Sequence, residues 1–133
     1  MGQNETLRVA LDMTEEWDKA TDGASGLTMG CVVVRTEFAQ QNKEALDLFL
    51  DEYERSVQTV TSAEGLEHAA QLAEQYNIVK APVARKAIPA CNIVFVQGEQ
   101  MQQIAGGFLE VLYQANPKSV GGKLPDANFY YNR

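Results

Sequence analysis

Near its C-terminus the chain reads Ala87-Ile-Pro-Ala-Cys-Asn-Ile-Val-Phe-Val-Gln-Gly-Glu-Gln-Met101 and, after a helical pattern, Asn116-Pro-Lys-Ser-Val-Gly-Gly-Lys-Leu-Pro-Asp-Ala-Asn-Phe-Tyr-Tyr131. The run Asn92–Val96 is mostly β-branched or aromatic, which predicts a short buried strand. From Gly98 to Ala115 the apolar residues recur every three or four positions, which predicts a helix with one apolar face. This part of the chain therefore indicates a strand, a helix and a tail that ends in aromatic residues.

Two segments nearer the N-terminus also predict strands. Leu7–Leu11 is short and mostly apolar, and Leu27–Arg35 ends in a continuous β-branched run, as in strands that are covered on both faces. Three strands make a small sheet, and each strand needs neighbours for its backbone groups. We therefore expect an α/β fold whose sheet is completed by another chain or by a lobe outside this sequence.

With the three short strands, about four helices are expected in the chain as a whole. Lys43–Thr61 and Ser62–Tyr76 each carry one apolar stripe at helical spacing, as amphipathic helices do. A shorter helix is predicted at Thr14–Ala20, with its first residue as the N-cap. Another is predicted at Lys80–Ala87, with its proline in the first turn, where the missing N–H costs little.

The helix predicted from Gly98 to Ala115 contains two consecutive glycines, Gly106 and Gly107. Two glycines in a helix interior should cost up to roughly 2 kcal/mol relative to two alanines. We expect this cost to be offset if another stretch of backbone packs close to the pair.

The composition is that of an acidic globular protein. The chain has 133 residues, of which 45% are apolar and 22% charged, and its formal net charge is −7. That length predicts one domain over residues 1–133. An acidic chain repels phosphate backbones, which argues against nucleic-acid binding. No apolar run approaches the roughly 20 residues that span a bilayer, and the polar start predicts no secretion signal within this chain.

No motif of a known catalytic class is present. The sequence lacks a Walker loop, a nucleophile elbow, a dinucleotide fingerprint, an HExxH pair and an EF-hand loop. The single histidine, His68, has no metal-site spacing and falls beside an apolar stripe, which favours a solvated surface position. We therefore expect no catalytic residue, no metal and no cofactor. A small enzyme with Cys31 or Cys91 as its nucleophile stays open as an alternative.

The two cysteines, Cys31 and Cys91, lie in strand-like runs outside any CxxC pair. One interpretation is that both are buried as small hydrophobic side chains. The other is a disulfide that joins two strands, which requires an oxidising compartment. The sequence leaves both interpretations open because it does not give the separation of the two Cα atoms.

Three residues are candidates for binding a small ligand. Thr28 and Met29 stand where the second strand is expected to begin, and ligands of α/β proteins often bind at such junctions. Trp17 is the only tryptophan and follows the first expected strand. Its indole either stacks on a ligand or covers the edge of the core.

From Leu7 to Tyr131 the chain resembles the C-terminal half of substrate-binding proteins of ABC importers, in the nitrate, sulfonate, taurine and thiamine-precursor group with the type II periplasmic-binding fold. The Asn116–Asp126 run is its most specific segment. The other segments that carry the resemblance are Val9–Trp17, Leu27–Arg35 with Phe38-Ala39, Glu44–Ser56, Ala87–Phe95 and Gly98–Met101. Lys43 stands where the group usually has a proline.

The resemblance implies a two-lobed receptor, not an enzyme, which closes on a small solute and docks on a membrane permease. It implies a periplasmic or extracellular location for the parent protein and a role for Trp17, Thr28 and Met29 near the cleft. A receptor half exposes apolar surface, so we also expect a possible homodimer. The alternative is a self-contained interaction or dimerisation domain with no small-molecule role.

Overall fold

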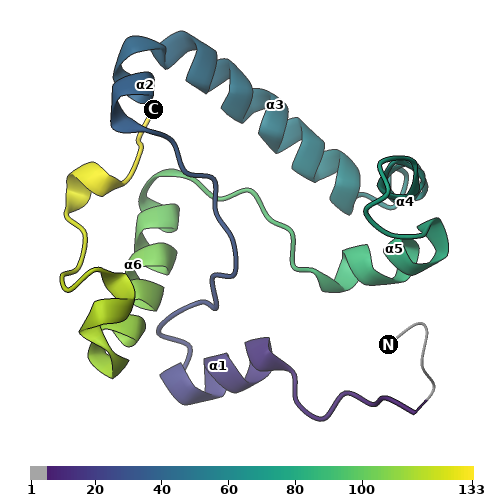
Figure 1. Cartoon of the computed structure of the whole chain (residues 1–133), viewed down its shortest axis with the longest axis horizontal. Helices are drawn as coiled ribbons and strands as arrows, with labels where there is room; N and C mark the ends of the chain where they lie inside the picture. The colour runs from purple at the N-terminus through teal and green to yellow at the C-terminus, as the bar shows by residue number, and fades with distance from the viewer. Residues whose placement is uncertain (1–5) are drawn as a thin grey trace. The chain divides into compact units, whose positions relative to one another are not determined.

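The structure is a computed structural model, and it describes residues 6–133. Every regular element in that range is a helix (Figure 1). The described chain divides into two compact units. Unit 1 comprises residues 6–33 and 96–133, and unit 2 comprises residues 34–95. No helix within residues 6–133 combines the length and the apolar character needed to cross a bilayer.

Unit 1 is built on α1 (Met13–Thr21) and the longer α6 (Gly98–Ala115). Helix α1 begins where the Asp12 carboxylate accepts hydrogen bonds from the backbone N–H groups of Thr14 and Glu15, at 2.9 and 3.2 Å. These are donors that the first turn of a helix leaves without an intrahelical partner. Asp12 is therefore the N-cap that fixes where α1 starts.

The tail that follows α6 forms two short 3₁₀ turns, η2 (Pro117–Val120) and η3 (Ala127–Phe129). The Asn116 side chain caps η2 by accepting a hydrogen bond from a backbone N–H of that turn at 3.2 Å. Gly121 and Gly122 then take φ values of 78° and 86°, which glycine adopts without steric cost. The Asn-Pro-Lys-Ser-Val-Gly-Gly motif thus encodes a capped turn followed by a left-handed exit.

Unit 2 is a succession of helices: α2 (Thr36–Gln41), α3 (Lys43–Thr61), α4 (Leu66–Gln75), α5 (Ala81–Ala87) and the 3₁₀ turn η1 (Ile88–Ala90). Helices α4 and α5 make the most extensive contact in this unit. Ala70 on α4 and Ala84 on α5 are 0% and 2% exposed. Small side chains of this kind let two helix backbones approach closely.

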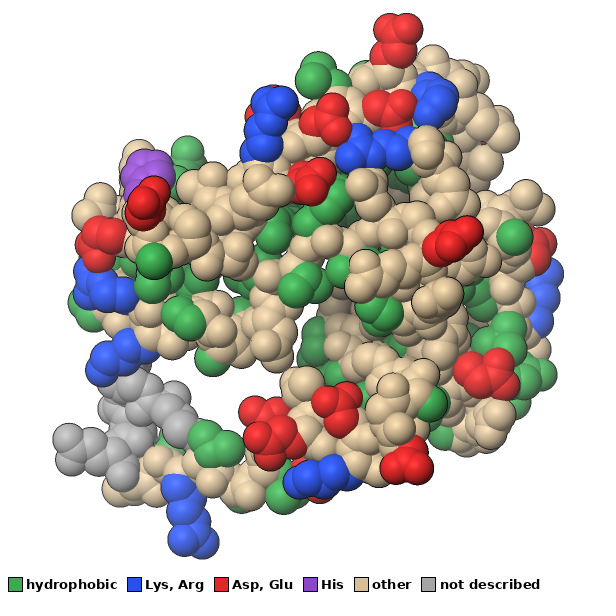
Figure 2. Space-filling model, turned by 180° about the vertical axis from the view of Figure 1, so that it is seen from behind, with side chains coloured by type: hydrophobic (Ala, Val, Ile, Leu, Met, Phe, Trp, Pro, Cys, Tyr) green, Lys and Arg blue, Asp and Glu red, His purple; other side chains and the backbone are tan. Residues whose placement is uncertain are grey.

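Little apolar surface is buried in either unit. Among the described residues, the buried apolar side chains all belong to unit 2 and are Leu46, Val57, Ala70 and Ala84. Many other hydrophobic side chains lie at the surface among acidic and basic ones (Figure 2). In unit 2 they include Phe49 and Tyr53, whose rings stack at 5.9 Å, while Phe95 meets Tyr53 edge-on at 5.9 Å.

The prediction of an α/β fold is wrong. Residues 7–11, 27–35 and 92–96, which were expected to be strands, form neither strand nor helix. A strand is stabilised by hydrogen bonds to a neighbouring strand, and no described residue supplies such a neighbour. The preference of β-branched residues for strands reflects packing on a half-buried pleated surface. Here Val9, Val33 and Val94 are 64%, 80% and 66% exposed, so that surface is missing.

The two longest helices have the bounds that their apolar stripes predict. Helix α3 spans Lys43–Thr61 and α6 spans Gly98–Ala115, which confirms both predictions. The expected N-cap of α1, Thr14, is wrong because Asp12 takes that position. The short helix α5 has Pro82 in its first turn, as predicted.

Helix α4 begins at Leu66, four residues after the predicted start at Ser62. The Ser62 hydroxyl accepts a hydrogen bond from the backbone N–H of Gly65 at 2.9 Å and donates one to the carbonyl of Thr59 at 2.9 Å. Serine side chains that bond locally in this way favour turns over helix interiors. The segment between α3 and α4 is therefore a turn closed by Ser62.

This turn predicts a strict requirement for glycine at position 65. A Cβ atom on Gly65 would collide with the backbone carbonyl of Thr59, and a collision with backbone forces a local shift that costs about 1–3 kcal/mol. We expect Gly65→Ala to lower the free energy of unfolding by that amount, measured by urea denaturation followed by circular dichroism. Gly30→Ala is the control, because a Cβ there meets nothing within 4 Å. Equal losses from both substitutions would contradict the steric argument.

Candidate functional site

Trp17 is held at the junction between α1 and α6 in unit 1. After α1, Asp22 and Gly23 adopt φ values of 55° and 71°, so the chain turns back toward the helix that it has just left. The turn brings the carbonyl of Ser25 to the indole, which donates a hydrogen bond from Nε1 at 2.9 Å. The Trp17 ring also packs against Phe108 of α6, with 5.1 Å between ring centroids and an angle of 42°. These two contacts fix the position of the half-buried indole.

The glycine pair of α6 is where other parts of unit 1 approach the helix. A Cβ on Gly107 would lie 3.4 Å from the Ser25 side chain and 3.6 Å from the carbonyl oxygen of Ala24. A Cβ on Gly106 would lie 3.5 Å from the Tyr130 hydroxyl. The expectation that another stretch of backbone packs against the pair is confirmed for Gly107.

One face of α6 lines a shallow, open groove of about 620 Å³. The lining residues are Glu99, Gln102, Gln103, Gly106 and Gly107, which recur at intervals of three and four and so share one side of the helix. The groove reaches Gly107, against which Ser25 packs. It is therefore a polar surface that adjoins the residue holding the Trp17 indole.

The three predicted ligand-binding residues differ in burial and in contacts. Trp17 is fixed at the junction, next to the segment that carries Thr28. The Thr28 Oγ1 atom is buried, and no hydrogen-bond partner for it exists among the described residues. Met29 is 85% exposed, and the structure brings it to neither the indole nor the groove lining.

The groove residues were missed by the sequence analysis, although a signal was present. Glu99, Gln102 and Gln103 precede the glycine pair on the same helical face, opposite to the apolar stripe that drew attention to α6. The signal was this polar face, which leads to a glycine pair that Tyr130 and Ser25 approach.

Both cysteines are free thiols at the surface, Cys31 in unit 1 and Cys91 in unit 2. The prediction that they are buried as small hydrophobic side chains is wrong, because the segments that carry them do not form covered strands. The possible disulfide between Cys31 and Cys91 is not formed in this structure.

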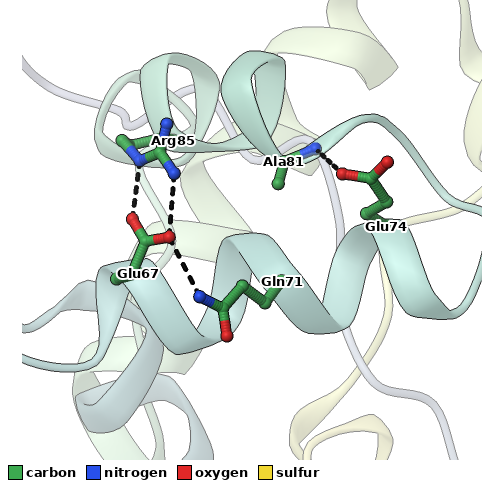
Figure 3. Close-up of polar contacts among 5 residues, drawn as sticks. All are labelled: Glu67, Gln71, Glu74, Ala81 and Arg85. Atoms are coloured by element: carbon green, nitrogen blue, oxygen red, sulfur yellow. Dashed lines mark hydrogen bonds and ion pairs between the residues drawn. The ribbon is translucent and has the colours of Figure 1, made fainter.

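A cluster of polar side chains with shifted pKa values lies in unit 2, between α4 and α5 (Figure 3). Arg85 binds both carboxylate oxygens of Glu67 through Nε and Nη2, at 2.7 and 2.8 Å, and Gln71 donates a further bond at 3.1 Å. The hydrogen bonds from Arg85, followed by that from Gln71, lower the pKa of Glu67. The same bonds to Glu67 raise the pKa of Arg85. Bidentate pairs of this kind fix geometry as well as charge.

A second carboxylate of α4 caps the start of α5. The Glu74 side chain accepts a hydrogen bond from the backbone N–H of Ala81 at 2.9 Å and one from Lys80 Nζ at 3.0 Å. The bond from Ala81, followed by that from Lys80, lowers the pKa of Glu74. The carboxylates of Glu67 and Glu74 are thus both engaged in joining the two helices, and this arrangement indicates a structural role.

Other reactive groups of the described chain do not gather into a site. His68 is exposed on α4, as expected for a solvated surface position. Within residues 6–133, no three His, Cys, Asp or Glu side chains lie close enough together to hold a metal ion.

Comparison of the chain with protein families, with curated proteins and with solved structures found no match to any of them.

The two carboxylates between α4 and α5 predict a pH dependence. Because both pKa values are lowered from the ordinary 4.5, their contribution to stability is present above that value and is lost as the pH falls through the lowered values. We expect the double substitution Glu67→Gln with Glu74→Gln to lower the thermal midpoint near neutral pH. It should also flatten the fall in that midpoint between about pH 6 and pH 3.

The control for this pH effect is Glu64→Gln, since Glu64 is exposed just before α4. Its thermal midpoints should follow those of the unaltered chain across the same range. A double variant that loses stability on acidification as steeply as the unaltered chain would show that other groups carry the pH dependence.

The glycine pair predicts a stabilising substitution. A Cβ on Gly106 would make an ordinary contact with the Tyr130 hydroxyl at 3.5 Å, and alanine is favoured over glycine in a helix interior by about 1 kcal/mol. We therefore expect Gly106→Ala to raise the free energy of unfolding by up to that amount in urea denaturation. Gly26→Ala lies outside any helix and should give no such gain. Loss of stability in Gly106→Ala would mean that Tyr130 requires the bare backbone.

Proposed function

We propose that this chain is part of the solute-binding component of an ABC importer. In that role it captures a small solute, delivers it to a membrane permease and catalyses no reaction. The parent protein acts in the periplasm or on the extracellular face of the cell membrane. The sheet that such a receptor would contain is not found among the described residues. The proposal is supported by the sequence segments that resemble this class of receptor and by the contacts that fix Trp17 in unit 1.

The observation that carries the proposal is the buried Thr28 hydroxyl, which has no hydrogen-bond partner among the described residues. An unsatisfied buried polar group costs about 1–3 kcal/mol. Because this atom is enclosed, a solute reaches it only if neighbouring side chains move, and a hydrogen bond to Thr28 Oγ1 then recovers this free energy. Thr28 follows closely in the sequence after Ser25, whose carbonyl fixes the Trp17 indole, so the proposed polar anchor and the fixed ring belong to neighbouring parts of unit 1.

The unusual exposure of apolar side chains favours a second candidate, an interaction or dimerisation domain. Val33, Val94 and Leu11 are 80%, 66% and 65% exposed, and exposed apolar surface commonly marks contact between proteins. Native mass spectrometry separates the two candidates. A dimer without bound solute supports the interaction domain, and a solute that travels with the chain supports the receptor.

The proposal predicts that small solutes perturb the only tryptophan of the chain. We expect at least one of taurine, methanesulfonate, nitrate and 4-aminopyrimidine to shift the Trp17 indole N–H signal saturably in ¹H–¹⁵N NMR spectra. Thr28→Val removes the hydroxyl while keeping the shape of the side chain, and it should weaken that binding about five- to tenfold. Thr36→Val, at the start of α2 in unit 2, is the matched control and should leave binding unchanged.

Two results would count against a receptor role. One is the absence of a saturable shift with all four solutes at millimolar concentration. The other is equal binding by the Thr28→Val chain and the unaltered chain, which would show that the hydroxyl makes no contact with the solute.

A further inference from the structure

The end of the chain runs back along α6. The Tyr130 hydroxyl reaches the backbone in the middle of that helix, where a Cβ on Gly106 would lie 3.5 Å from it. Farther along, Arg133 Nε donates a hydrogen bond of 2.8 Å to the Gln97 side chain, just before α6 begins. Residues 127–133, which we call the C-terminal strap, therefore lie alongside the first half of α6 and run in the opposite direction (Figure 1).

Three consecutive residues of α6 each contact a different part of unit 1. Gly106 adjoins the C-terminal strap. A Cβ on Gly107 would lie 3.4 Å from the Ser25 side chain. Phe108 packs against the Trp17 ring, and the carbonyl of Ser25 accepts the hydrogen bond of the same indole. The strap and both contacts that fix the indole therefore meet on one turn of α6.

This turn of α6 depends on groups that pack against it from outside. Two consecutive glycines weaken a helix, because glycine has more backbone entropy to lose and brings no side chain to pack. The half-buried Tyr130 supplies such a group at Gly106. We propose that docking of the C-terminal strap on α6 orders the glycine pair and so holds the Trp17 indole in place, and that release of the strap loosens the indole.

The contacts that hold the C-terminal strap lie largely at the surface. Phe129 is 64% exposed, and the hydrogen bond between Arg133 and Gln97 joins two exposed side chains, so it competes with bonds to water. Elements with few buried apolar contacts open locally at a low free-energy cost. The strap therefore has two states, docked and released, and it exchanges between them while the rest of unit 1 stays folded.

This coupling extends to solute binding if the proposed function holds. Coupling between two sites acts equally in both directions. A solute that contacts Trp17 then stabilises the docked strap, and release of the strap weakens solute binding. The C-terminal strap is in that case a regulatory element of the receptor, and this consequence rests on the proposed function.

The test follows hydrogen exchange of the Trp17 indole N–H by NMR in the full chain, with no solute added. We expect Tyr130→Ala to accelerate this exchange about five- to tenfold, because a half-buried ring is lost from the glycine pair. Tyr76→Ala is the matched control, since it removes the same kind of side chain from a position in unit 2 that is 70% exposed. It should leave the exchange of the indole unchanged.

A second variant tests whether the glycine pair carries the effect. Gly106→Ala, introduced into the Tyr130→Ala chain, strengthens α6 in the absence of the strap contact. We expect the indole exchange to slow again by about fivefold, the factor that corresponds to the difference in helix propensity between glycine and alanine. Exchange that stays fast would overturn the proposed route through α6.

Two further results would overturn the inference. One is unchanged indole exchange in Tyr130→Ala. The other is an equal acceleration of the backbone amides of α4 in unit 2, because this would report a general loss of stability.

The proposed function is judged separately, by adding taurine, methanesulfonate, nitrate and 4-aminopyrimidine to the unaltered chain. If none of them binds, the function fails, while the coupling between the strap and the indole stands. If one of them binds, Tyr130→Ala should weaken its binding by no more than the factor seen in the exchange. Equal binding by both chains would overturn the regulatory role.

Discussion

The constraint that governs this molecule is that every backbone N–H and C=O group needs a partner, and a helix finds its partners within its own segment. Segments with helical patterns therefore become ordered by themselves, whereas an extended segment depends on a neighbour. Among the described residues, the segments 7–11, 27–35 and 92–96, which form neither helix nor strand, have no such neighbour. The result is a set of helices joined by irregular segments in which many apolar side chains are exposed.

The same constraint explains how far the sequence predicts the structure. The bounds of α3 and α6 follow from apolar residues at helical spacing, because that pattern and the helical hydrogen bonds are both local. The start of α1 was misplaced because the cap was assigned to Thr14, whereas the Asp12 carboxylate accepts the hydrogen bonds of the first turn. The strands were predicted from side-chain preference alone. That preference depends on packing against a neighbouring strand, and the sequence does not show whether such a neighbour is present.

The candidate site was predictable only in part. Trp17 and Thr28 stood out by residue type and position, and both proved constrained, one by a hydrogen bond and the other by burial without a partner. The groove face of α6 was not predicted, because the periodicity of apolar residues identifies only the apolar side of a helix. Gly106 and Gly107 lie at one end of the groove. The same two glycines are approached by the Tyr130 hydroxyl and by residues 24–25.

The single tryptophan lies in unit 1, whereas helices are distributed over both units. Its fluorescence therefore senses the surroundings of the α1–α6 junction only, while the far-ultraviolet circular dichroism signal averages over all helices. If the two units melt together, the two signals must change at the same denaturant concentration. If the units melt independently and differ in stability, the curves separate, and the gap between them reports how much more stable one unit is than the other.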